Sequence, residues 1–266
     1  MSWVLVALLM LLVFVDVALI RQNRRLRKRL KRKKKNFPCP IPRIRIDELD
    51  PIFRVGPHGP GHRAAVRMVG RADLPVEGGV SDEEAWVLGA LAKGAHRIFE
   101  FGTCTGRTTW ILAENSPADA RVGTLTLASG QHGEYEHEAG DDATARDFAL
   151  AESRFDEFYY TGTSVEGKVD QIFGDSKHFD ESEWVDRCDL VFVDGSHAYS
   201  YVLSDSRKAI RMVKPGGLVL WHDYRGPYRR DTLDVYRALN ELAREWPLAH
   251  VRSTAFAAYR RAELSV

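Results

Sequence analysis

The stretch IFEFGTCTGRTTW, residues 98–110, decides the fold that we expect for this chain. Its first four residues predict a buried strand, residues 102–106 a loop bracketed by two glycines, and Arg107 the start of a helix. Glycines at 102 and 106 let the backbone turn sharply and approach a ligand, toward which the first helical turn would direct free amides. Ordinary strand-to-helix turns also contain paired glycines, so a binding loop and a structural turn both remain open.

Further strands and helices alternate along the chain. Apolar runs predict strands at residues 121–127, 169–173, 188–193 and 218–221. Helical patterns cover residues 107–114, 147–158, 199–213 and 231–245. A helix opened by the capping box SDEE precedes the first strand, and strands at residues 248–253 and 255–260 end the chain. We therefore predict a Rossmann-like α/β fold, a doubly wound and mostly parallel seven-stranded sheet with an antiparallel C-terminal strand pair.

In such a sheet the carboxyl ends of the parallel strands share one edge, where ligands bind. Polar residues directly after the predicted strands converge there: Glu100, Asp175, Asp194, His222 and Asp223. The second strand ends in Thr126, where nucleotide-binding sheets commonly place a carboxylate for the ribose hydroxyls. Glu134 or Glu136 in the acidic stretch that follows could replace that carboxylate, although a solvated loop also explains the stretch.

The N-terminal residues 3–20 form an apolar run that carries one charge, Asp16. As a helix at 1.5 Å per residue this run would span roughly 27 Å, close to the thickness of a bilayer's hydrocarbon core. Positive charge follows the run instead of preceding it, which favours a membrane anchor over a cleaved signal peptide. Because basic flanks stay in the cytoplasm, we expect a single-pass protein of the cytoplasmic membrane, with its N-terminus outside and its C-terminal domain cytoplasmic.

The basic flank begins at Arg21, ends at Lys35 and holds eleven Lys or Arg residues. We expect it to bind anionic lipids, with RNA binding as the alternative. Asp16 would pair with this flank or with a polar group of a partner membrane protein. Without the flank and Asp16, the 38 basic and 37 acidic residues of the chain become 27 and 36, a net charge of −9. This acidic remainder argues against nucleic-acid binding by the folded part.

Three parts are therefore expected along the chain. Residues 1–20 would be the transmembrane anchor, residues 21–50 a polybasic arm with a proline-rich linker, and residues 51–266 the folded domain. FPCPIP, residues 37–42, has proline at alternate positions and predicts a stiff spacer. Three widely spaced cysteines indicate neither a disulfide framework nor a zinc site.

From about Ser81 to Arg261 the chain resembles a class I S-adenosylmethionine (SAM)-dependent methyltransferase. Ordered motifs carry the resemblance: EFGTCTGRTT at residues 100–109, GDS at 174–176, VDGSHAY at 193–199, KPGGLVLWHDY at 214–224 and TAFAAYRR at 254–261. The combination of DGSHxY with PGGxxxxHD is particularly similar to a bacterial branch of small-molecule and sugar O-methyltransferases. The resemblance implies SAM as the cofactor and a small or lipid-linked hydroxyl compound as the acceptor.

The resemblance also assigns roles to single residues. The implied cofactor-binding residues are Glu100, Gly102, Thr103 and Gly106 on the amino-acid and ribose side, Thr126 at the ribose, Asp175 and Ser176 at the adenine, and Asp194 at the methionine moiety. Two positions depart from the common pattern, because Cys104 replaces the middle glycine of the loop and Thr126 replaces an acid. Loss of that charge-assisted hydrogen-bond pair would cost about 1.5–3 kcal/mol of binding free energy.

Methyl transfer from a sulfonium is an in-line displacement, so the protein must align donor and acceptor and take up the acceptor's proton. His197 and His222 are the candidate bases, with Asp223 as a third catalytic candidate, although each histidine could instead make a structural hydrogen bond. Asp194 and Asp223 end neighbouring strands and could hold Mg²⁺, or serve cofactor and helix-capping roles without a metal.

Two other functions are weighed against a methyltransferase. The alternative is a membrane-tethered methyltransferase-like scaffold without turnover, a subunit of a membrane protein complex, which Thr126 and Asp16 motivate. A dinucleotide oxidoreductase fits less well, because the loop spacing is G-x-x-x-G and not G-x-G-x-x-G.

Overall fold

The computed structural model describes residues 22, 39–70 and 79–263. The expected membrane anchor, residues 1–20, and almost all of the basic flank lie outside the described residues. Within the described ranges, no helix is long and apolar enough to cross a membrane. The described residues from Cys39 onward belong to one compact unit.

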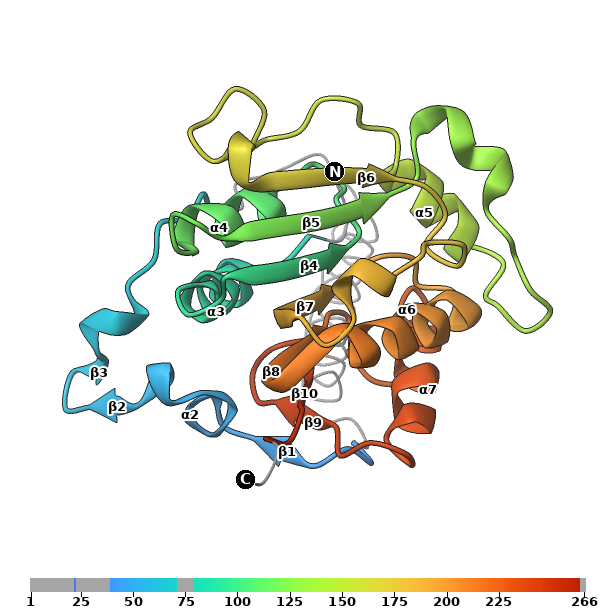
Figure 1. The fold of residues 1–266 in the computed structure, drawn as a ribbon. Coiled ribbons are helices and arrows are strands. Elements are labelled where there is room, and N and C mark those ends of the chain that lie inside the picture. The colour runs from blue at the N-terminus through green and yellow to red at the C-terminus, as the bar shows by residue number, and fades with distance from the viewer. Residues whose placement is uncertain (1–21, 23–38, 71–78, 264–266) are drawn as a thin grey trace, which may run out of the picture. The chain divides into compact units, whose positions relative to one another are not determined.

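A sheet of eight strands forms the middle of this unit, in the order β1-β9-β10-β8-β7-β4-β5-β6 (Figure 1). Its parallel strands are β4 (Arg97–Phe101), β5 (Arg121–Thr126), β6 (Val169–Phe173), β7 (Cys188–Val193) and β8 (Val213–Trp221). β10 (Ala257–Arg260) runs antiparallel to both β8 and β9 (Ala249–Val251). The predicted doubly wound sheet with an antiparallel C-terminal pair is confirmed.

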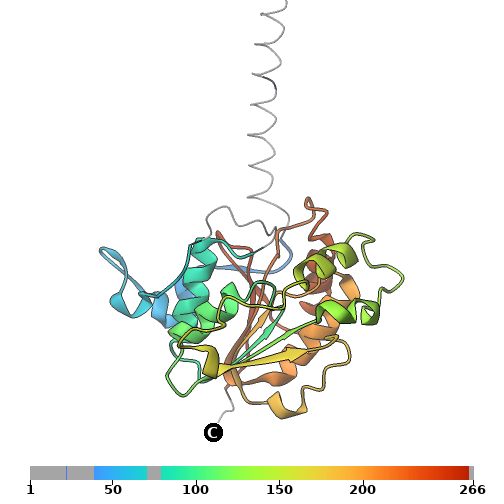
Figure 2. The same ribbon diagram turned by 90° about the horizontal axis from the view of Figure 1, so that it is seen from above.

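Helices cover both faces of the sheet (Figure 2). α3 (Asp82–Ala92) and α4 (Arg107–Asn115) pack together on one face, and α6 (Tyr199–Met212) and α7 (Leu233–Leu242) pack together on the other. Strands covered on both faces are expected to be mostly apolar, as the central strand β7 is, whereas β4 also buries the carboxyl group of Glu100. The predicted capping box opens α3, since Glu84 N–H donates to Ser81 Oγ and Ser81 N–H donates to Glu84 Oε2.

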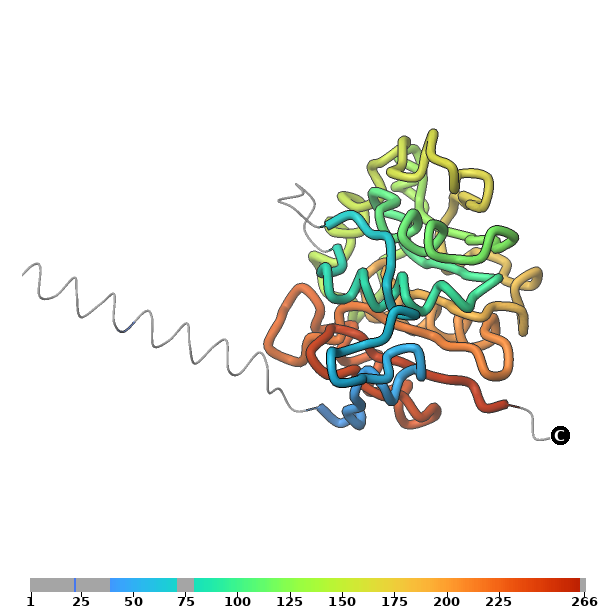
Figure 3. Tube along the Cα trace, turned by 90° about the vertical axis from the view of Figure 1, so that its left-hand side faces the viewer, coloured from blue at the N-terminus to red at the C-terminus, as the bar shows by residue number. Residues whose placement is uncertain are grey.

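The eighth strand comes from a segment that the sequence assigns to the linker. β1 (Arg43–Ile44) pairs in parallel with β9, and the side chain of Ile41 beside it is buried. Figure 3 shows the blue start of the described segment alongside the red C-terminal strands. Residues 39–50 are therefore part of the folded unit. The sequence could not predict this, because a strand of two residues is too short to show an alternating apolar pattern.

Short elements follow β1, where the sequence predicts an irregular lead-in. They are α2 (Ile46–Leu49), the 3₁₀ turns Pro51–Phe53 and His62–Ala64, and a hairpin of β2 (Val55–Gly56) and β3 (Gly59–Pro60). Phe53 is fully buried and packs edge-on against Trp86 of α3, so this lead-in is attached to the core.

The helix predicted over residues 147–158 is shorter than expected. α5 (Ala145–Glu152) ends before an irregular segment in which Tyr159 N–H donates to the carbonyl oxygen of Thr105 at 2.9 Å. In the same segment, the stacked rings of Phe158 and Tyr160 lie next to Gly106. These long-range contacts with the glycine loop replace the last predicted turn of the helix, and α5 lies near the carboxyl ends of β5 and β6 (Figure 1).

Gly102 provides a test of how closely the loop approaches its neighbour. It has φ of +98°, and a Cβ there would lie 2.2 Å from the carbonyl oxygen of Asp194. We expect Gly102→Ala to lower the free energy of unfolding by about 1–3 kcal/mol more than Gly140→Ala. Gly140 is the matched control because its φ is +110° while nothing lies within 4 Å of the position that a Cβ would take there. Equal losses in denaturant unfolding of the two variants would contradict the close approach.

Candidate functional site

Backbone hydrogen bonds connect the end of β4 and the loop after it to the ends of the neighbouring strands β5 and β7. Asp194 N–H donates to the carbonyl oxygen of Phe101 at 2.9 Å, and Gly102 N–H donates to that of Leu125 at 2.8 Å. α4 begins directly after Gly106, whose φ is +74°. The strand order reverses between β4 and β7, which is where doubly wound sheets bind their ligands.

A cavity of about 60 Å³ lies at this point of the sheet edge. Its wall includes Gly102, Thr126, Ser176 and Asp194 from the strand ends, Glu152 from α5 and Asp205 from α6. Oδ1 of the buried Asp205 has no hydrogen-bond partner among the described residues. Apolar walls with a few polar groups are typical of small-molecule sites.

Two tyrosines form another part of the cavity wall. The rings of Tyr135 and Tyr201 stack with centroids 4.5 Å apart, and the hydroxyl of Tyr135 lies 2.7 Å from Ser196 Oγ. Tyr201 donates its hydroxyl proton to Asp175 Oδ2 at 2.6 Å. Asp175 is buried and is not among the residues of the wall, so it holds Tyr201 in place.

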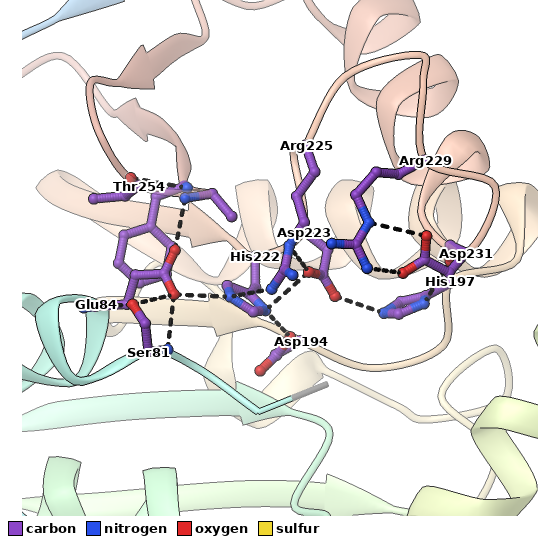
Figure 4. Close-up of polar contacts among 12 residues, drawn as sticks. Ser81, Glu84, Asp194, His197, His222, Asp223, Arg225, Arg229, Asp231 and Thr254 are labelled. Atoms are coloured by element: carbon purple, nitrogen blue, oxygen red, sulfur yellow. Dashed lines mark hydrogen bonds and ion pairs between the residues drawn. The ribbon is translucent and has the colours of Figure 1, made fainter. Parts of the chain in front are cut away.

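A chain of charged side chains runs next to the cavity, from α3 to the loops after β7 and β8 (Figure 4). Glu84 of α3 lies 3.4 Å from Nε2 of His222, and Nδ1 of His222 lies 2.9 Å from Oδ1 of Asp194. Asp223 continues the chain, with Oδ2 at 2.8 Å from Nε2 of His197. Long-range folding therefore brings together all three predicted catalytic residues and the predicted methionine-side acid.

The surroundings of both histidines favour their imidazolium forms. Burial would lower the pKa of His222, but the charges of Asp194 and Asp223 raise it well above its ordinary value. Burial acts in the same direction on His197, whose pKa the hydrogen bond and charge of Asp223 raise to about 9. Nδ1 of His197 also lies 2.9 Å from the carbonyl oxygen of Asp231. Each ring thus has oxygen atoms close to both nitrogens, and Nε2 of His222 also lies 3.5 Å from Nη2 of Arg225. The raised pKa values favour the protonated rings, in which neither nitrogen has a lone pair for an acceptor's proton.

Glu84 ties this charged chain to the rest of the domain. Its Oε1 accepts the backbone N–H of Ala255 at 2.6 Å, while Oε2 accepts from Ser81 and His222. Burial would raise the pKa of Glu84, but the hydrogen bond and charge of His222, together with these amides, lower it to about 2. Glu84 is therefore ionised and serves both as the helix cap and as a counter-ion of His222.

Three other carboxyl groups, those of the buried Glu100 and Asp205 and of the half-buried Glu152, shift in the opposite direction. Burial raises the pKa of Glu100 to about 8, and those of Glu152 and Asp205 to about 7. Glu100 lies under the loop, where Oε2 accepts hydrogen bonds from Thr109 and Thr124. Glu152 makes no hydrogen bond to any described residue and faces the cavity, so its carboxylate is available to a ligand.

A family model described as a methyltransferase domain matches residues 99–224. This part of the chain is therefore similar to methyltransferase domains. Its match covers the glycine loop, the cavity's strand ends and the pair His222–Asp223. The match supports the predicted methyltransferase domain, and the alternative of an inactive scaffold is not favoured.

Solved structures similar to the methyltransferase domain include two bound complexes. The O-methyltransferase TomG from Streptomyces achromogenes, involved in tomaymycin synthesis and in complex with SAM, is 23% identical over 71% of this chain and 84% of its own, with a TM-score of 0.47. The O-methyltransferase from Bacillus cereus in complex with SAH, the demethylated product, is 18% identical over 70% and 84%, with a TM-score of 0.45. No curated protein matches the chain significantly.

The structure divides the predicted cofactor residues into two groups. Residues that line the cavity are Gly102, Thr126, Ser176 and Asp194. Residues that support the wall from behind are Glu100, Thr103, Gly106 and Asp175. Thr103 illustrates the second group, since its buried hydroxyl lies 2.8 Å from that of Thr124. Position after a strand thus identified the neighbourhood, while the direction of each side chain required the structure.

The acidic stretch after β5 contributes to the cavity in an unexpected way. Glu134 and Glu136, weighed as substitutes for the ribose acid, are exposed, whereas Tyr135 between them is buried in the wall. Sequence reasoning also missed Glu152 and Asp205, because their helices turn only one side toward the cavity and the helical pattern does not say which. The acidic character of the stretch was a misleading signal for a direct ligand.

The predicted magnesium site is not supported by the geometry. Nδ1 of His222 lies between the two proposed ligands, 2.9 Å from Asp194 and 3.5 Å from Asp223. Together the three residues can bring ligand atoms within 4.8 Å of one another. Mg²⁺ prefers an octahedron of oxygen ligands, several of them water. Here the buried imidazolium takes the position between the carboxylates, and Asp223 also contacts Arg225, so the set does not fit Mg²⁺.

Glu84→Gln tests the link between the helix cap and the charged chain. At pH 7 we expect a loss of about 3 kcal/mol in the free energy of unfolding, because the variant leaves a buried imidazolium short of a counter-ion. With its pKa lowered from 4.5 to about 2, Glu84 contributes stability that is present above pH 4.5 and is lost as the pH falls toward 2. The difference between wild type and variant should therefore shrink below pH 4.5.

Denaturant unfolding between pH 3 and pH 7 measures this difference. Glu83→Gln is the matched control, because Glu83 is the exposed neighbour on the same helical turn. A difference that stays constant across the pH range would show that Glu84 acts by packing and not by charge.

Proposed function

We propose that this protein transfers the methyl group of SAM to a hydroxyl group of a small or lipid-linked acceptor at the cytoplasmic face of a membrane. The observation that carries the proposal is the cavity at the reversal of strand order, with the glycine loop, Thr126, Ser176 and Asp194 in its wall. The oxygen acceptor follows from the resemblance of the DGSHxY and PGGxxxxHD motifs to O-methyltransferases.

The residues of the wall fit SAM as the donor. SAM would supply a methyl group on a positively charged sulfur. Asp194, whose Oδ1 is held by His222, would accept hydrogen bonds from the methionine amino group. Thr126 would meet the ribose, and Ser176 with the unpartnered Oδ1 of Asp205 would meet the adenine edge. An unpartnered buried oxygen is costly, and a ligand donor would remove that cost.

Entry of a ligand requires part of the wall to move. Pockets for ligands of this size measure roughly 300–1,000 Å³, whereas the cavity measures about 60 Å³. The strand ends are fixed by the sheet, but Tyr135 and Glu152 belong to the long connection between β5 and β6. That connection is held to α6 by Asp141, which accepts hydrogen bonds from the backbone and hydroxyl of Ser200 at 2.8 Å each. We infer that this connection moves outward when SAM binds.

The charged chain beside the cavity serves to position the reacting groups. His197 and His222 carry their protons already, so they act as fixed positive charges that hold Asp223 and Asp194. Fixed dipoles and charges of this kind cost no reorganisation during the displacement. We infer that the acceptor's proton leaves for a group other than these two histidines.

The membrane part of the proposal is supported by the sequence. The apolar run of residues 3–20 is followed at once by the basic flank, and each Lys or Arg close to an anionic membrane surface contributes about 1 kcal/mol of binding. A domain tethered in this way would meet acceptors that are dissolved in or attached to the inner leaflet.

Titration calorimetry of SAM and SAH into the full chain in detergent micelles tests the proposed function. We expect both ligands to bind with micromolar dissociation constants. Absence of heat up to millimolar concentrations of either ligand would overturn the proposal and favour the scaffold.

Thr126→Asp tests the missing ribose acid within the same experiment. The new carboxylate would accept hydrogen bonds from the ribose hydroxyls, so we expect SAH to bind about tenfold more tightly, or about 1.4 kcal/mol. Gly130→Asp is the matched control, because it adds the same charge at an exposed position outside the cavity wall. Equal changes in the two variants would mean that net charge, and not a ribose contact, controls the affinity.

Membrane attachment needs a separate measurement. The full chain should remain with the membrane pellet after an alkaline carbonate wash, and protease added to inverted vesicles should digest its C-terminal domain. Release by the wash, or digestion only in right-side-out vesicles, would contradict the proposed anchor or its orientation.

A further inference from the structure

The charges of the cavity wall are all of one sign. Among the described residues that line it, Glu152, Asp194 and Asp205 are acidic, and none is Lys, Arg or His. Asp194 has a partner behind the wall, since its Oδ1 contacts His222. Glu152 has no hydrogen bond or ion pair with any described residue, and Oδ1 of Asp205 has no hydrogen-bond partner among them either.

Glu152 lies at the glycine-loop end of the cavity. It is the last residue of α5 and shares the wall with Cys104 and Asp194. Burial raises the pKa of the Cys104 thiol to about 12, and the nearby charge of Glu152 adds to that effect. The segment that follows Glu152 packs on the glycine loop, where Tyr159 N–H donates to the carbonyl oxygen of Thr105 at 2.9 Å and Phe158 lies next to Gly106. Glu152 therefore lines the cavity on the side of the glycine loop, where the methionine half of the donor is expected.

A carboxylate in such a place favours a positively charged ligand. Removing a charge from water is costly unless an opposite charge replaces the water. At about 4–6 Å in a medium of effective dielectric constant near 20, opposite unit charges attract by roughly 3–4 kcal/mol before desolvation is subtracted. A sulfonium is a unit cation without N–H groups, so it is recognised by charge and not by hydrogen bonds.

We propose that Glu152 lies beside the sulfonium of the donor and makes the site prefer the cationic donor over the neutral product. The inference rests on the proposed function. In the displacement, the bond from the methyl carbon to sulfur breaks, its electron pair stays on sulfur, and the bond from carbon to the acceptor oxygen forms. The acceptor hydroxyl gives up its proton to water in the same step. The sulfur loses its positive charge, and with it the attraction to Glu152. Glu152 is a specificity-determining residue that helps the product to leave.

Three ligands distinguish an effect of ligand charge from an effect of ligand shape in the test of this inference. SAM carries the sulfonium, SAH lacks both the methyl group and the charge, and sinefungin carries an ammonium group in place of the methylated sulfur. Calorimetry on the full chain in detergent micelles should show that Glu152→Gln raises the dissociation constants of SAM and sinefungin about tenfold. The dissociation constant of SAH should change less than twofold. Glu152→Asp, which keeps the charge, should retain most of the preference for SAM over SAH.

Glu157→Gln is the control, because Glu157 is an exposed acid on the segment that follows α5. Thermal unfolding of each variant would confirm that the fold is kept. Equal weakening of SAM and SAH in Glu152→Gln would show a structural role and overturn the inference, as would unchanged binding of all three ligands. Failure of the wild-type chain to bind any of the three would instead overturn the proposed function itself.

Discussion

The buried imidazolium of His222 connects segments that lie far apart in the sequence. Glu84 approaches it from α3 and Asp194 from the loop after β7, while His222 itself directly follows β8. A charge with no exposed side-chain surface is stable only while its counter-ions stay in place. Because Glu84 also accepts the backbone N–H of Ala255, this one ion fixes the start of α3, the last strands and the carboxyl edge of the sheet together.

This constraint shapes the candidate site more than it supplies chemistry to it. His222 orients Asp194, and His197 orients Asp223, so the two carboxylates at the strand ends cannot rotate freely. Residue types alone make the histidines candidate bases. Their surroundings keep both rings protonated, and the site becomes an arrangement of fixed charges that electrostatic catalysis can use.

The separation of charge around the cavity follows from the same arrangement. His222 is buried behind the cavity wall and does not line the cavity, whereas the carboxyl groups of Glu152, Asp194 and Asp205 line it. Asp194 is balanced by the cation behind it, whereas Glu152 comes from the connection after β5 and has no such balance among the described residues. A cavity built in this way suits a donor that enters with a positive charge and leaves without one.

The sequence by itself determined the features that depend on neighbouring residues. Strand and helix order, the glycine loop and the capping box of Ser81 and Glu84 follow from local periodicity and local hydrogen bonds, so they could be predicted. The convergence of Asp194, His222 and Asp223 also followed, because parallel strands share one carboxyl edge. Only the tertiary structure decided the second role of Glu84, the side chains that enter the cavity and the protonation of the histidines. Each of these depends on distances between segments distant in the sequence and on burial, and neither quantity is contained in a local pattern.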